Sequence, residues 1–560
     1  MTATQNLRTG GQILVDQLRI HGADTIFCVP GESYLASLDA LYDARDDIRL
    51  VVCRQEGGAA YMADAYGKLT GRPGICFVTR GPGAANASLG IHTAHQDSTP
   101  VILLVGQVAR AMMGRESFQE VDFRQMYAPL AKWVDQIDDP ARIPEMVSRA
   151  FHVATSGRPG PVVLALPEDM QKETAAANDA RRYAPIQPAP DPAAMDRLRA
   201  MLTAAKRPFV IVGGSGWTKV ACTDFRAFVE ASDLPVGAAF RRQDLLDNRH
   251  PNYAGDIGLG INPALGRRLQ ETDLLLVVGA QMSETITDGY TRFALPCPSQ
   301  TFIHVAAGLD ELARVYEPDL GINAGMAAFA AAAKAMAPVA VPPWRDWTRA
   351  ARADHEANIA LPPMKGEVDL GAVIRWLADT LPDDAIVANG AGNFSNWVHR
   401  FYCYRDYPTQ LAPQSGSMGY GVPAGVAAKI VYPERVVVSI SGDGDFLMCG
   451  QEIATARQYA LGVVFIVVNN GSYGTIRMHQ ERYYPGRVSG TELVNPDFAA
   501  LARAYGLHGE TVTRTADFAA AFERCRAADG PSLIELQIEK DQISPRATIS
   551  GLRAAAQGKR

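Results

Sequence analysis

The sequence has no apolar run long enough to cross a membrane. Its longest apolar stretches, Leu274 to Val278 and Leu461 to Val468, fall well short of the roughly 18 to 20 residues that a membrane helix needs. The N-terminal segment, Met1 to Gly11, lacks the apolar core of a secretion signal. From these absences we expect a cytoplasmic protein.

Metal-type cysteine spacing and a basic excess are also missing. No C-x-x-C pair is present and no histidine stands near a cysteine at metal-ligand spacing, so we expect reduced thiols in the core. The eight cysteines are Cys28, Cys53, Cys76, Cys222, Cys297, Cys403, Cys449 and Cys525. A net charge of -6 without a Lys/Arg cluster argues against nucleic acid as a partner.

The composition is that of a folded protein with several domains. Apolar residues make up 47% and charged residues 20% of 560 residues, which is ordinary globular usage. A chain of this length is expected to form roughly three domains. Proline-rich breaks at Gln171 to Pro192 and at Pro338 to Pro343 separate them. We therefore expect domains at residues 1–175, 193–335 and 360–545, and a C-terminal tail at 546–560.

Strand-like and helix-period segments alternate in all three domains, which predicts an α/β fold with three doubly wound parallel-sheet domains. The first and third domains also echo one another. Each has a Gly/Ala-rich helix (57–67 and 419–429), then a strand (74–79 and 436–441), then a glycine-rich turn (Gly81-Pro82-Gly83 and Gly442-Asp443-Gly444). We favour duplication over a chance similarity of two ordinary βαβ units. Small residues on these helices would let helices approach closely, as at a subunit interface.

The strongest local pattern joins Asp443 to Asn470. They stand 27 positions apart, after two β-branched strands, so a right-handed crossover would bring both to the carboxyl edge of neighbouring parallel strands. A carboxylate, an amide oxygen and the backbone carbonyl of Ser472 would give Mg²⁺ three oxygen ligands and leave room for diphosphate oxygens. Either turn alone is more often structural than functional. The pair at this spacing predicts a magnesium and diphosphate site.

This block resembles the diphosphate-binding motif of thiamine-diphosphate enzymes, and the resemblance extends over nearly the whole chain to the acetolactate synthase group. The segments that carry it are Phe27-Cys28-Val29-Pro30-Gly31, Gln55-Glu56-Gly57-Gly58, Gly81-Pro82-Gly83-Ala84-Ala85-Asn86, Gly106-Gln107-Val108, Phe118-Gln119-Glu120 and Met418-Gly419-Tyr420-Gly421. It implies that the first domain binds the aminopyrimidine, that the third binds the diphosphate, and that the site lies between the subunits of a homodimer or homotetramer.

The resemblance gives Glu56 the central catalytic role. It matches the glutamate that hydrogen-bonds the pyrimidine ring nitrogen and drives the cofactor to its imino form. Without the resemblance, a carboxylate that only stabilises a helix N-terminus is the plainer interpretation. Glu32 stands where acetolactate synthases have a small apolar residue and pyruvate decarboxylase-like enzymes carry an acid, so it would be a second acid/base at the substrate carbon, although a plain surface or helix-start glutamate explains it about as well. Gln119 is the third expected catalytic residue.

The resemblance also implies a set of cofactor contacts. Met418 aligns with the bulky residue that bends the cofactor, although a gap-filling core methionine would look the same. The carbonyl of Gly416 would accept a hydrogen bond from the pyrimidine amino group. The other expected cofactor residues are Pro30, Thr79, Asn86, Asn393, Phe394, Gly442, Gly444, Asp445, Tyr473, Gly474 and Thr475.

Three departures from acetolactate synthases bear on the substrate. Glu168 stands where the acetolactate synthase pattern has a lysine. We therefore expect weak turnover of simple keto acids, and faster turnover of them in Glu168→Lys. His479 stands near their tryptophan. In the middle domain, Gln281 to Thr285 replaces an Arg/Asp-rich stretch and Val305 to Gly308 lacks an acid for a ribose hydroxyl, which leaves open whether FAD or a nucleotide binds there.

Two other functions stay open at this stage. An acyl-CoA lyase related to oxalyl-CoA decarboxylase or 2-hydroxyacyl-CoA lyase would use the arginine pairs at 241–242 and 267–268 for CoA phosphates. An NAD-dependent dehydrogenase would use the turn at 213–216, which lacks the full G-x-G-x-x-G spacing. A non-catalytic relative is disfavoured because Glu56, Asp443 and Asn470 are all present. The donor and acceptor substrates, 2-keto acid or acyl-CoA, are not identified.

Overall fold

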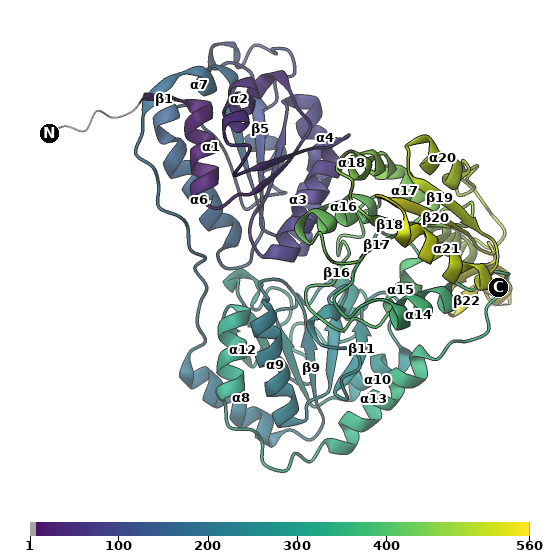
Figure 1. Ribbon diagram of the computed structural model, residues 1–560. Helices are drawn as coiled ribbons and strands as arrows, with labels where there is room; N and C mark the ends of the chain where they lie inside the picture. Colours follow the sequence, from purple (N-terminus) through teal and green to yellow (C-terminus); the bar gives the residue numbers. More distant parts are fainter. Residues whose placement is uncertain (1–6, 559–560) are drawn as a thin grey trace. The chain divides into compact units, whose positions relative to one another are not determined.

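The structure, a computed structural model, describes residues 7–558 (Figure 1). Residues 1–6 of the N-terminal segment and 559–560 of the expected tail lie outside the described residues. One compact unit comprises the chain up to Ile186 together with Val426–Val431, and the other comprises the rest. Three six-stranded parallel sheets confirm the predicted fold class. Among the described residues, no helix combines the length and apolar character that a membrane span requires.

The N-terminal sheet has the order β3-β2-β4-β5-β7-β6. Its strands are β2 (Thr25–Cys28), β3 (Arg49–Val52), β4 (Gly74–Val78), β5 (Val101–Gln107), β6 (Trp133–Gln136) and β7 (Pro161–Pro167). Alternate residues such as Ile75 and Phe77 pack in one core with α1 (Gly10–Ile20), α2 (Leu35–Asp43) and α6 (Ile143–Thr155). The opposite face is covered by α3 (Glu56–Thr70) and α4 (Gly81–Asp97) (Figure 1).

The predicted turn at Gly81-Pro82-Gly83 is wrong, because these residues are the first turn of α4. Proline is favoured at this position, where a backbone N–H would lack an intrahelical partner in any case. The small residues of α3 serve the packing of α4 within the chain. A Cβ at Gly90 of α4 would come within 2.4 Å of the Cβ of Ala60.

Part of the predicted linker is ordered. After α7 (Glu168–Lys172), strand β8 (Thr174–Ala176) pairs with β1 (Leu7–Thr9) in antiparallel register. The rest of the linker, residues 177–191, forms neither helix nor strand. Earlier in the same domain, the short helix α5 (Phe123–Tyr127) lies between β5 and β6.

The middle sheet has the order β11-β10-β9-β12-β13-β14, as in dinucleotide-binding folds. The strands are β9 (Pro208–Val212), β10 (Val236–Ala239), β11 (Tyr253–Ile257), β12 (Leu274–Val278), β13 (Thr301–Ala306) and β14 (Leu320–Asn323). One face carries α8 (Pro192–Ala204), α9 (Lys219–Ser232) and α12 (Met326–Ala335). The other carries α10 (Pro263–Glu271), α11 (Glu284–Thr287) and α13 (Arg345–Ile359).

The C-terminal sheet has the order β16-β15-β17-β18-β20-β19. The strands are β15 (Ile386–Asn389), β16 (Gln410–Leu411), β17 (Val437–Gly442), β18 (Val463–Asn469), β19 (His508–Val512) and β20 (Ser532–Gln537). Counted along the chain, the second strand stands at one edge beside the first, followed by the third, fourth, sixth and fifth. The N-terminal sheet has the same order, which supports the predicted duplication.

Helices cover both faces of this sheet. They are α14 (Leu370–Thr380), α15 (Ser395–Phe401), α16 (Gly421–Val431), α17 (Asp443–Cys449), α18 (Ile453–Gln458), α20 (Phe498–Ala504) and α21 (Thr515–Ala527). As in the first domain, the predicted Gly442-Asp443-Gly444 turn is wrong, because α17 begins at Asp443 directly after β17. Asp443 and Asn470 nevertheless follow neighbouring parallel strands, as predicted.

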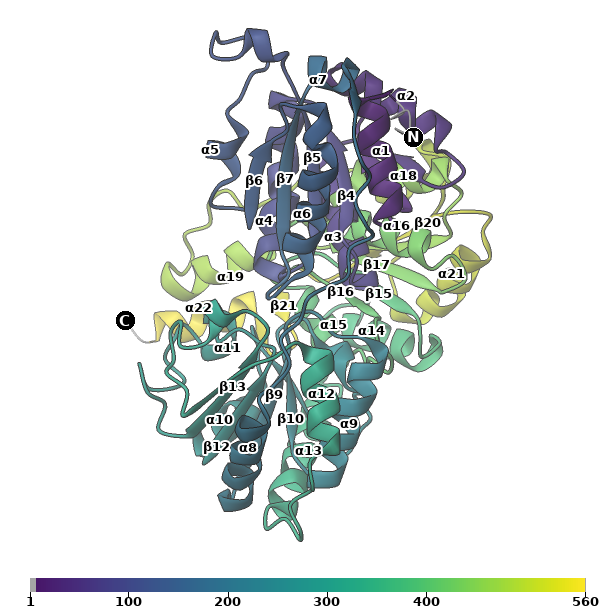
Figure 2. The same ribbon diagram turned by 90° about the vertical axis from the view of Figure 1, so that its left-hand side faces the viewer.

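The C-terminal segment is folded. Strands β21 (Gln542–Ser544) and β22 (Ala547–Thr548) lead into α22 (Ile549–Gln557), which lies beside α19 (Gly474–Tyr483) (Figure 2). The cysteines are free thiols, but the prediction that all lie in the core is wrong for Cys297, which is exposed, and for Cys222 and Cys403, which are partly buried.

Candidate active site

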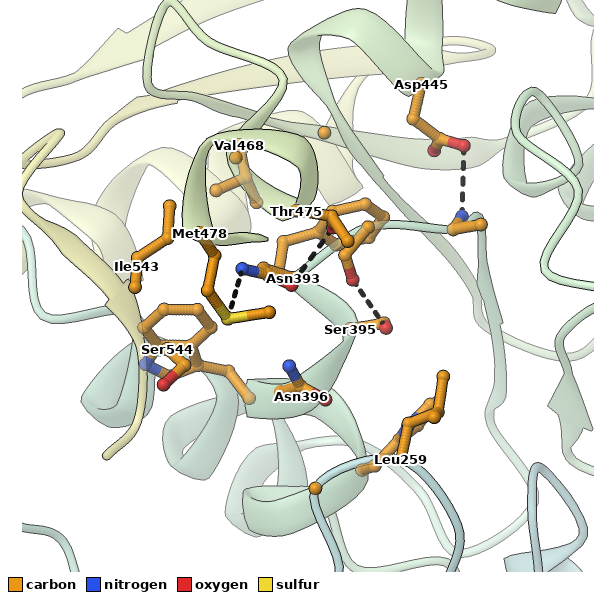
Figure 3. Close-up of a pocket in the computed structure, with 18 of the residues that line it drawn as sticks. Leu259, Asn393, Ser395, Asn396, Asp445, Val468, Thr475, Met478, Ile543 and Ser544 are labelled. Carbon is orange, nitrogen blue, oxygen red and sulfur yellow. Dashed lines mark hydrogen bonds between the residues drawn. The ribbon is translucent and has the colours of Figure 1, made fainter. Parts of the chain in front are cut away.

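A cavity of about 840 Å³ opens at the carboxyl ends of β15, β17 and β18 (Figure 3). It is lined by every predicted cofactor residue that belongs to the second compact unit, which contains the middle and C-terminal sheets. These are Asn393, Phe394, Gly416, Met418, Gly442, Asp443, Gly444, Asp445, Asn470, Ser472, Tyr473, Gly474 and Thr475. Since β16 lies on one side of β15 and β17 on the other, the sheet reverses its winding between β15 and β17. Ligands of open α/β sheets bind outside such a switch point.

Asp443 is buried at this edge, and both of its carboxylate oxygens accept hydrogen bonds. The backbone N–H of Gly444 donates to Oδ1 at 2.9 Å, and Asn495 Nδ2 donates to Oδ2 at 2.7 Å. The same Asn495 nitrogen donates to Asn469 Oδ1 at 2.9 Å. Asn495 was missed from the sequence because it lies in an irregular loop far from either strand end.

The residues present fit a magnesium and diphosphate group. Asp443, Asn470 and Ser472 offer a carboxylate, an amide and a backbone oxygen to one cavity, the donor chemistry that Mg²⁺ prefers. Beside them, the buried Oδ1 of Asn495 has no hydrogen-bond partner among the described residues. A buried oxygen without a partner is costly, and this one belongs to the residue that donates to Asp443.

At two positions glycine allows a close approach in the loops that would hold the diphosphate. A Cβ at Gly444 would lie 2.5 Å from Tyr473 Cε1, and a Cβ at Gly474 would lie 3.3 Å from Asn470 Nδ2. The loop after β18 is held by a second segment, because Tyr473 N donates to Thr491 O at 2.9 Å and Leu493 N donates to Gly471 O at 2.9 Å. Hydrogen bonds within the protein therefore hold these loops in place without a ligand.

Asp445 braces the cavity wall. Its Oδ1 accepts from the backbone N–H of Ala391 at 3.0 Å, the bond drawn at Asp445 in Figure 3. It also accepts from the backbone N–H of Gly419 at 2.8 Å, which ties the loop after β15 to the loop that carries Met418. Burial raises the pKa of Asp445 to about 6. Asn393 holds the opposite wall, accepting from Thr475 Oγ1 at 3.0 Å and contacting Met478 Sδ at 3.6 Å (Figure 3).

The far side of the cavity contains charged and polar residues that the sequence did not indicate. Asp256 lies in β11 of the middle sheet, and burial raises its pKa to about 7. His399 is buried, neither ring nitrogen has a partner among the described residues, and burial lowers its pKa well below the usual range. Arg546 reaches this wall from the expected tail and donates to the carbonyls of Gly260 and Ile261.

The other predicted residues lie at the carboxyl edge of the N-terminal sheet. Glu56 begins α3, whose N-cap is Gln55, and its Oε2 accepts a hydrogen bond from Asn86 Nδ2 at 2.9 Å. Gly83 allows a close approach here, because a Cβ would lie 3.2 Å from Glu56 Oε1 and 2.9 Å from Thr79 Cγ2. Asn86 is therefore placed to orient the carboxylate.

Glu32, Thr79 and Gln119 are neighbours at the same edge. Thr79 Oγ1 lies 3.0 Å from Ser33 Oγ, and the carbonyl of Gln119, whose φ is +66°, accepts from Gly81 N at 3.1 Å. Pro30 lies in the loop between β2 and Glu32. Glu32 accepts a hydrogen bond from Arg80 Nη2 at 2.6 Å, a partner that the sequence analysis missed.

The arginines considered for CoA phosphates do not gather at one place. Arg241 is buried and donates to the carbonyls of Pro413 and Gly390. Arg268 is paired with Asp354 at 2.6 Å and stacks over Trp347. Both side chains are engaged by the protein itself, and Arg241 also lines the cavity.

Comparison with known proteins gives the class. Residues 8–126 match the thiamine pyrophosphate enzyme N-terminal TPP binding domain, 195–333 the central domain and 390–536 the C-terminal TPP binding domain. Each match falls on one of the three parallel-sheet domains, and the C-terminal match contains all the predicted cofactor residues that line the cavity. Fold and site together define a thiamine pyrophosphate enzyme.

Relatives narrow the class. The acetolactate synthase isozyme 2 large subunit of Escherichia coli (strain K12) is 30% identical over 95% of this chain and 96% of its own length. The acetolactate synthase large subunits of Parasynechococcus marenigrum (strain WH8102), 31% identical, and Lactococcus lactis subsp. lactis (strain IL1403), 30% identical, each match 95% of this chain and 88% and 93% of their own lengths. The chain belongs to the acetolactate synthase-like group of thiamine-diphosphate-dependent enzymes.

Proposed function

We propose that this enzyme uses thiamine diphosphate and Mg²⁺ to form or cleave a carbon–carbon bond next to a carbonyl, with a 2-keto acid as donor. The observation that carries the proposal is the gathering of all predicted diphosphate-side residues around one cavity at a switch point. A chance set of turn residues would not share a crevice of this kind.

The proposed roles follow from the chemistry of each group. Asp443, Asn470 and the carbonyl of Ser472 hold Mg²⁺, and the N–H groups at the start of α19 and the glycines beside them meet the diphosphate. The carbonyl of Gly416 accepts from the aminopyrimidine, and Met418 supports the ring. When bound, thiamine diphosphate supplies the carbon nucleophile and the electron sink of the reaction.

Glu56 holds the proton that the pyrimidine ring nitrogen exchanges. A general acid–base group must be fixed within hydrogen-bond reach of its target, and the 2.9 Å bond from Asn86 restrains its carboxylate. Glu32 and Gln119 stand at the same sheet edge and serve the substrate side. The roles of these residues rest on the family resemblance together with their placement.

We propose domains at 1–175, 193–335 and 360–545 and a homo-oligomeric enzyme, a dimer or a tetramer. In this assembly Glu56 of one chain and Asp443 of another serve the same cofactor, as the resemblance implies. Relatives named as large subunits are consistent with assembly into oligomers.

The proposal includes no flavin. The loop after β12, from Gly279 to Ser283, carries no charged residue, and α11 follows with Glu284 exposed. After β13 the chain runs through Ala306, Ala307 and Gly308 without an acid for a ribose hydroxyl. Neither the described residues nor the relatives named above favour the acyl-CoA alternative.

The test is a substrate screen with the purified protein. Pyruvate, glyoxylate, benzoylformate and an acyl-CoA thioester are supplied one at a time, with and without thiamine diphosphate and Mg²⁺. We expect keto-acid turnover that requires both cofactors. Turnover of the thioester alone, or activity that ignores both cofactors, would overturn the proposal.

A further inference from the structure

One cation and two carboxylates meet at the switch point of the N-terminal sheet. This acceptor cluster, as we name it, consists of Glu32, Arg80 and Glu168. Arg80 Nη2 donates to Glu32 Oε1 at 2.6 Å, and Arg80 Nη1 lies 3.9 Å from Glu168 Oε2. The side chain of Arg80 is 10% exposed, that of Glu168 is 25% exposed and that of Glu32 is 67% exposed.

The fold explains why these residues meet. Strand β3 lies on one side of β2 and β4 on the other, so the winding of the sheet reverses between β2 and β4. Glu32 follows β2 and Arg80 follows β4, which places both at the crevice where a ligand of such a sheet binds. Glu168 follows β7 at the same carboxyl edge. Glu56, the first residue of α3 after β3, is part of this edge as well.

The charges of the cluster do not cancel. One guanidinium faces two carboxylates, so the group carries one net negative charge, and the arginine fork already has a carboxylate in it. A substrate carboxylate approaching this edge would have to displace Glu32 and would still meet Glu168. An uncharged carbonyl compound meets neither obstacle.

One exposed aromatic ring lies beside the cluster. Arg80 Cζ lies 6.0 Å from the ring centroid of Phe118, and the Phe118 side chain is 74% exposed. An aromatic ring packs favourably against an apolar or aromatic group of a ligand. The net charge and the exposed ring therefore point to the same kind of ligand.

We propose that the acceptor cluster selects an uncharged, apolar aldehyde as the acceptor of the carboligation, in place of a second 2-keto acid. The inference rests on the proposed function. In the reaction the donor keto acid loses CO₂, its acyl carbon bonds to the aldehyde carbon, and the aldehyde oxygen takes up a proton to give a 2-hydroxy ketone.

The test compares two acceptors with the same donor, so that any effect on the donor cancels. The holoenzyme receives the best keto acid of the screen together with either benzaldehyde or 2-ketobutyrate. One net charge at contact distance predicts a kcat/KM for benzaldehyde at least about tenfold higher than for 2-ketobutyrate. Glu168→Gln should narrow this ratio about tenfold by lowering the KM for 2-ketobutyrate.

Glutamine is the informative replacement, because the Glu168→Lys change expected from the sequence would set a second cation against Arg80. The matched control is Glu173→Gln, which removes the same charge from a residue paired with Arg110, and the ratio should stay unchanged. A second readout needs no variant. Raising the salt concentration from about 0.05 to about 0.5 M screens exposed charges, so it should raise the kcat/KM for 2-ketobutyrate more than that for benzaldehyde.

The outcomes are distinguishable. Absence of any cofactor-dependent product from any donor refutes the proposed function. If products form but the kcat/KM for 2-ketobutyrate equals that for benzaldehyde, the acceptor assignment is wrong while the proposed function stands. The same holds if neither Glu168→Gln nor salt changes the ratio of the two kcat/KM values.

Discussion

Asn86 donates a hydrogen bond from Nδ2 to Oε2 of Glu56 at 2.9 Å, and Oε1 has no hydrogen-bond partner among the described residues. A carboxylate held at one oxygen and open at the other suits proton exchange with a ring nitrogen. The bond joins the first turn of α3 to α4, so two helices that pack together fix one side chain.

Glu56→Gln should therefore lose turnover by about 10²-fold or more while the fold persists, because an amide cannot exchange the proton. Steady-state kinetics and a melting curve measure the two effects. Glu145→Gln is the control, since Glu145 also lies in the first turn of a helix and should leave turnover unchanged. Near-normal activity of Glu56→Gln would show that the catalytic carboxylate is elsewhere.

Thiamine diphosphate and Mg²⁺ together should raise the melting temperature, and neither alone should do so fully. Binding at about 100 times Kd stabilises the native state by about 2.7 kcal/mol. Asp443→Ala should abolish the shift because it removes the carboxylate ligand, whereas Asp517→Asn, at an exposed pair with Arg514, should keep it. A full shift in Asp443→Ala would place the metal at other ligands.

Mixing inactive Glu56→Ala subunits with inactive Asp443→Ala subunits should restore activity. If two chains share each site, a hybrid dimer has one site without either mutation and one site with both. The measurement is activity after subunit exchange, with exchange demonstrated by two different tags. If the exchanged mixture stays inactive, both residues of each site come from one chain.

The purified enzyme should be colourless. The absence of charged residues from Gly279 to Ser283 gives a flavin few partners in the middle domain. An absorption spectrum between 350 and 500 nm, with free FAD added and then removed by gel filtration, is the measurement, and bound flavin bands would contradict this expectation.

Docking of α22 on α19 should depend on pH through Glu481. Arg553 donates to both of its oxygens at 2.9 and 2.7 Å and, with Arg477, lowers the pKa of Glu481 to about 2. A lowered carboxyl pKa stabilises the folded state above the unfolded value of about 4.5, and this contribution is lost as the pH falls toward 2. Its size is about 1–3 kcal/mol, reduced because Arg553 is 38% exposed.

Glu481→Gln should therefore increase hydrogen exchange in α22 at pH 7, and the gap to the parent should close in acid. Glu523→Gln, at the exposed pair with Arg526, should change exchange little. Equal protection of α22 in Glu481→Gln and the parent at pH 7 would show that packing alone holds the helix.

The sequence by itself determined the alternation of strands and helices and the placement of Asp443 and Asn470 at one edge of a sheet. Apolar β-branched runs specify buried parallel strands, and a crossover of fixed hand brings Asp443 and Asn470 to one edge, so spacing along the chain was enough. The start of α4 at Gly81 was mistaken for a turn because Gly-Pro-Gly signals both, and only hydrogen bonding distinguishes them.

The tertiary structure alone decided which distant residues meet. Arg80 and Glu32 stand 48 positions apart, and Asn495 reaches Asp443 from 52 positions away, with no periodicity that predicts either contact. Arg546, assigned to a tail, lines the cavity because α22 packs on α19 and brings the preceding strands with it. Such contacts depend on strand order and loop packing, which are long-range properties of the whole chain.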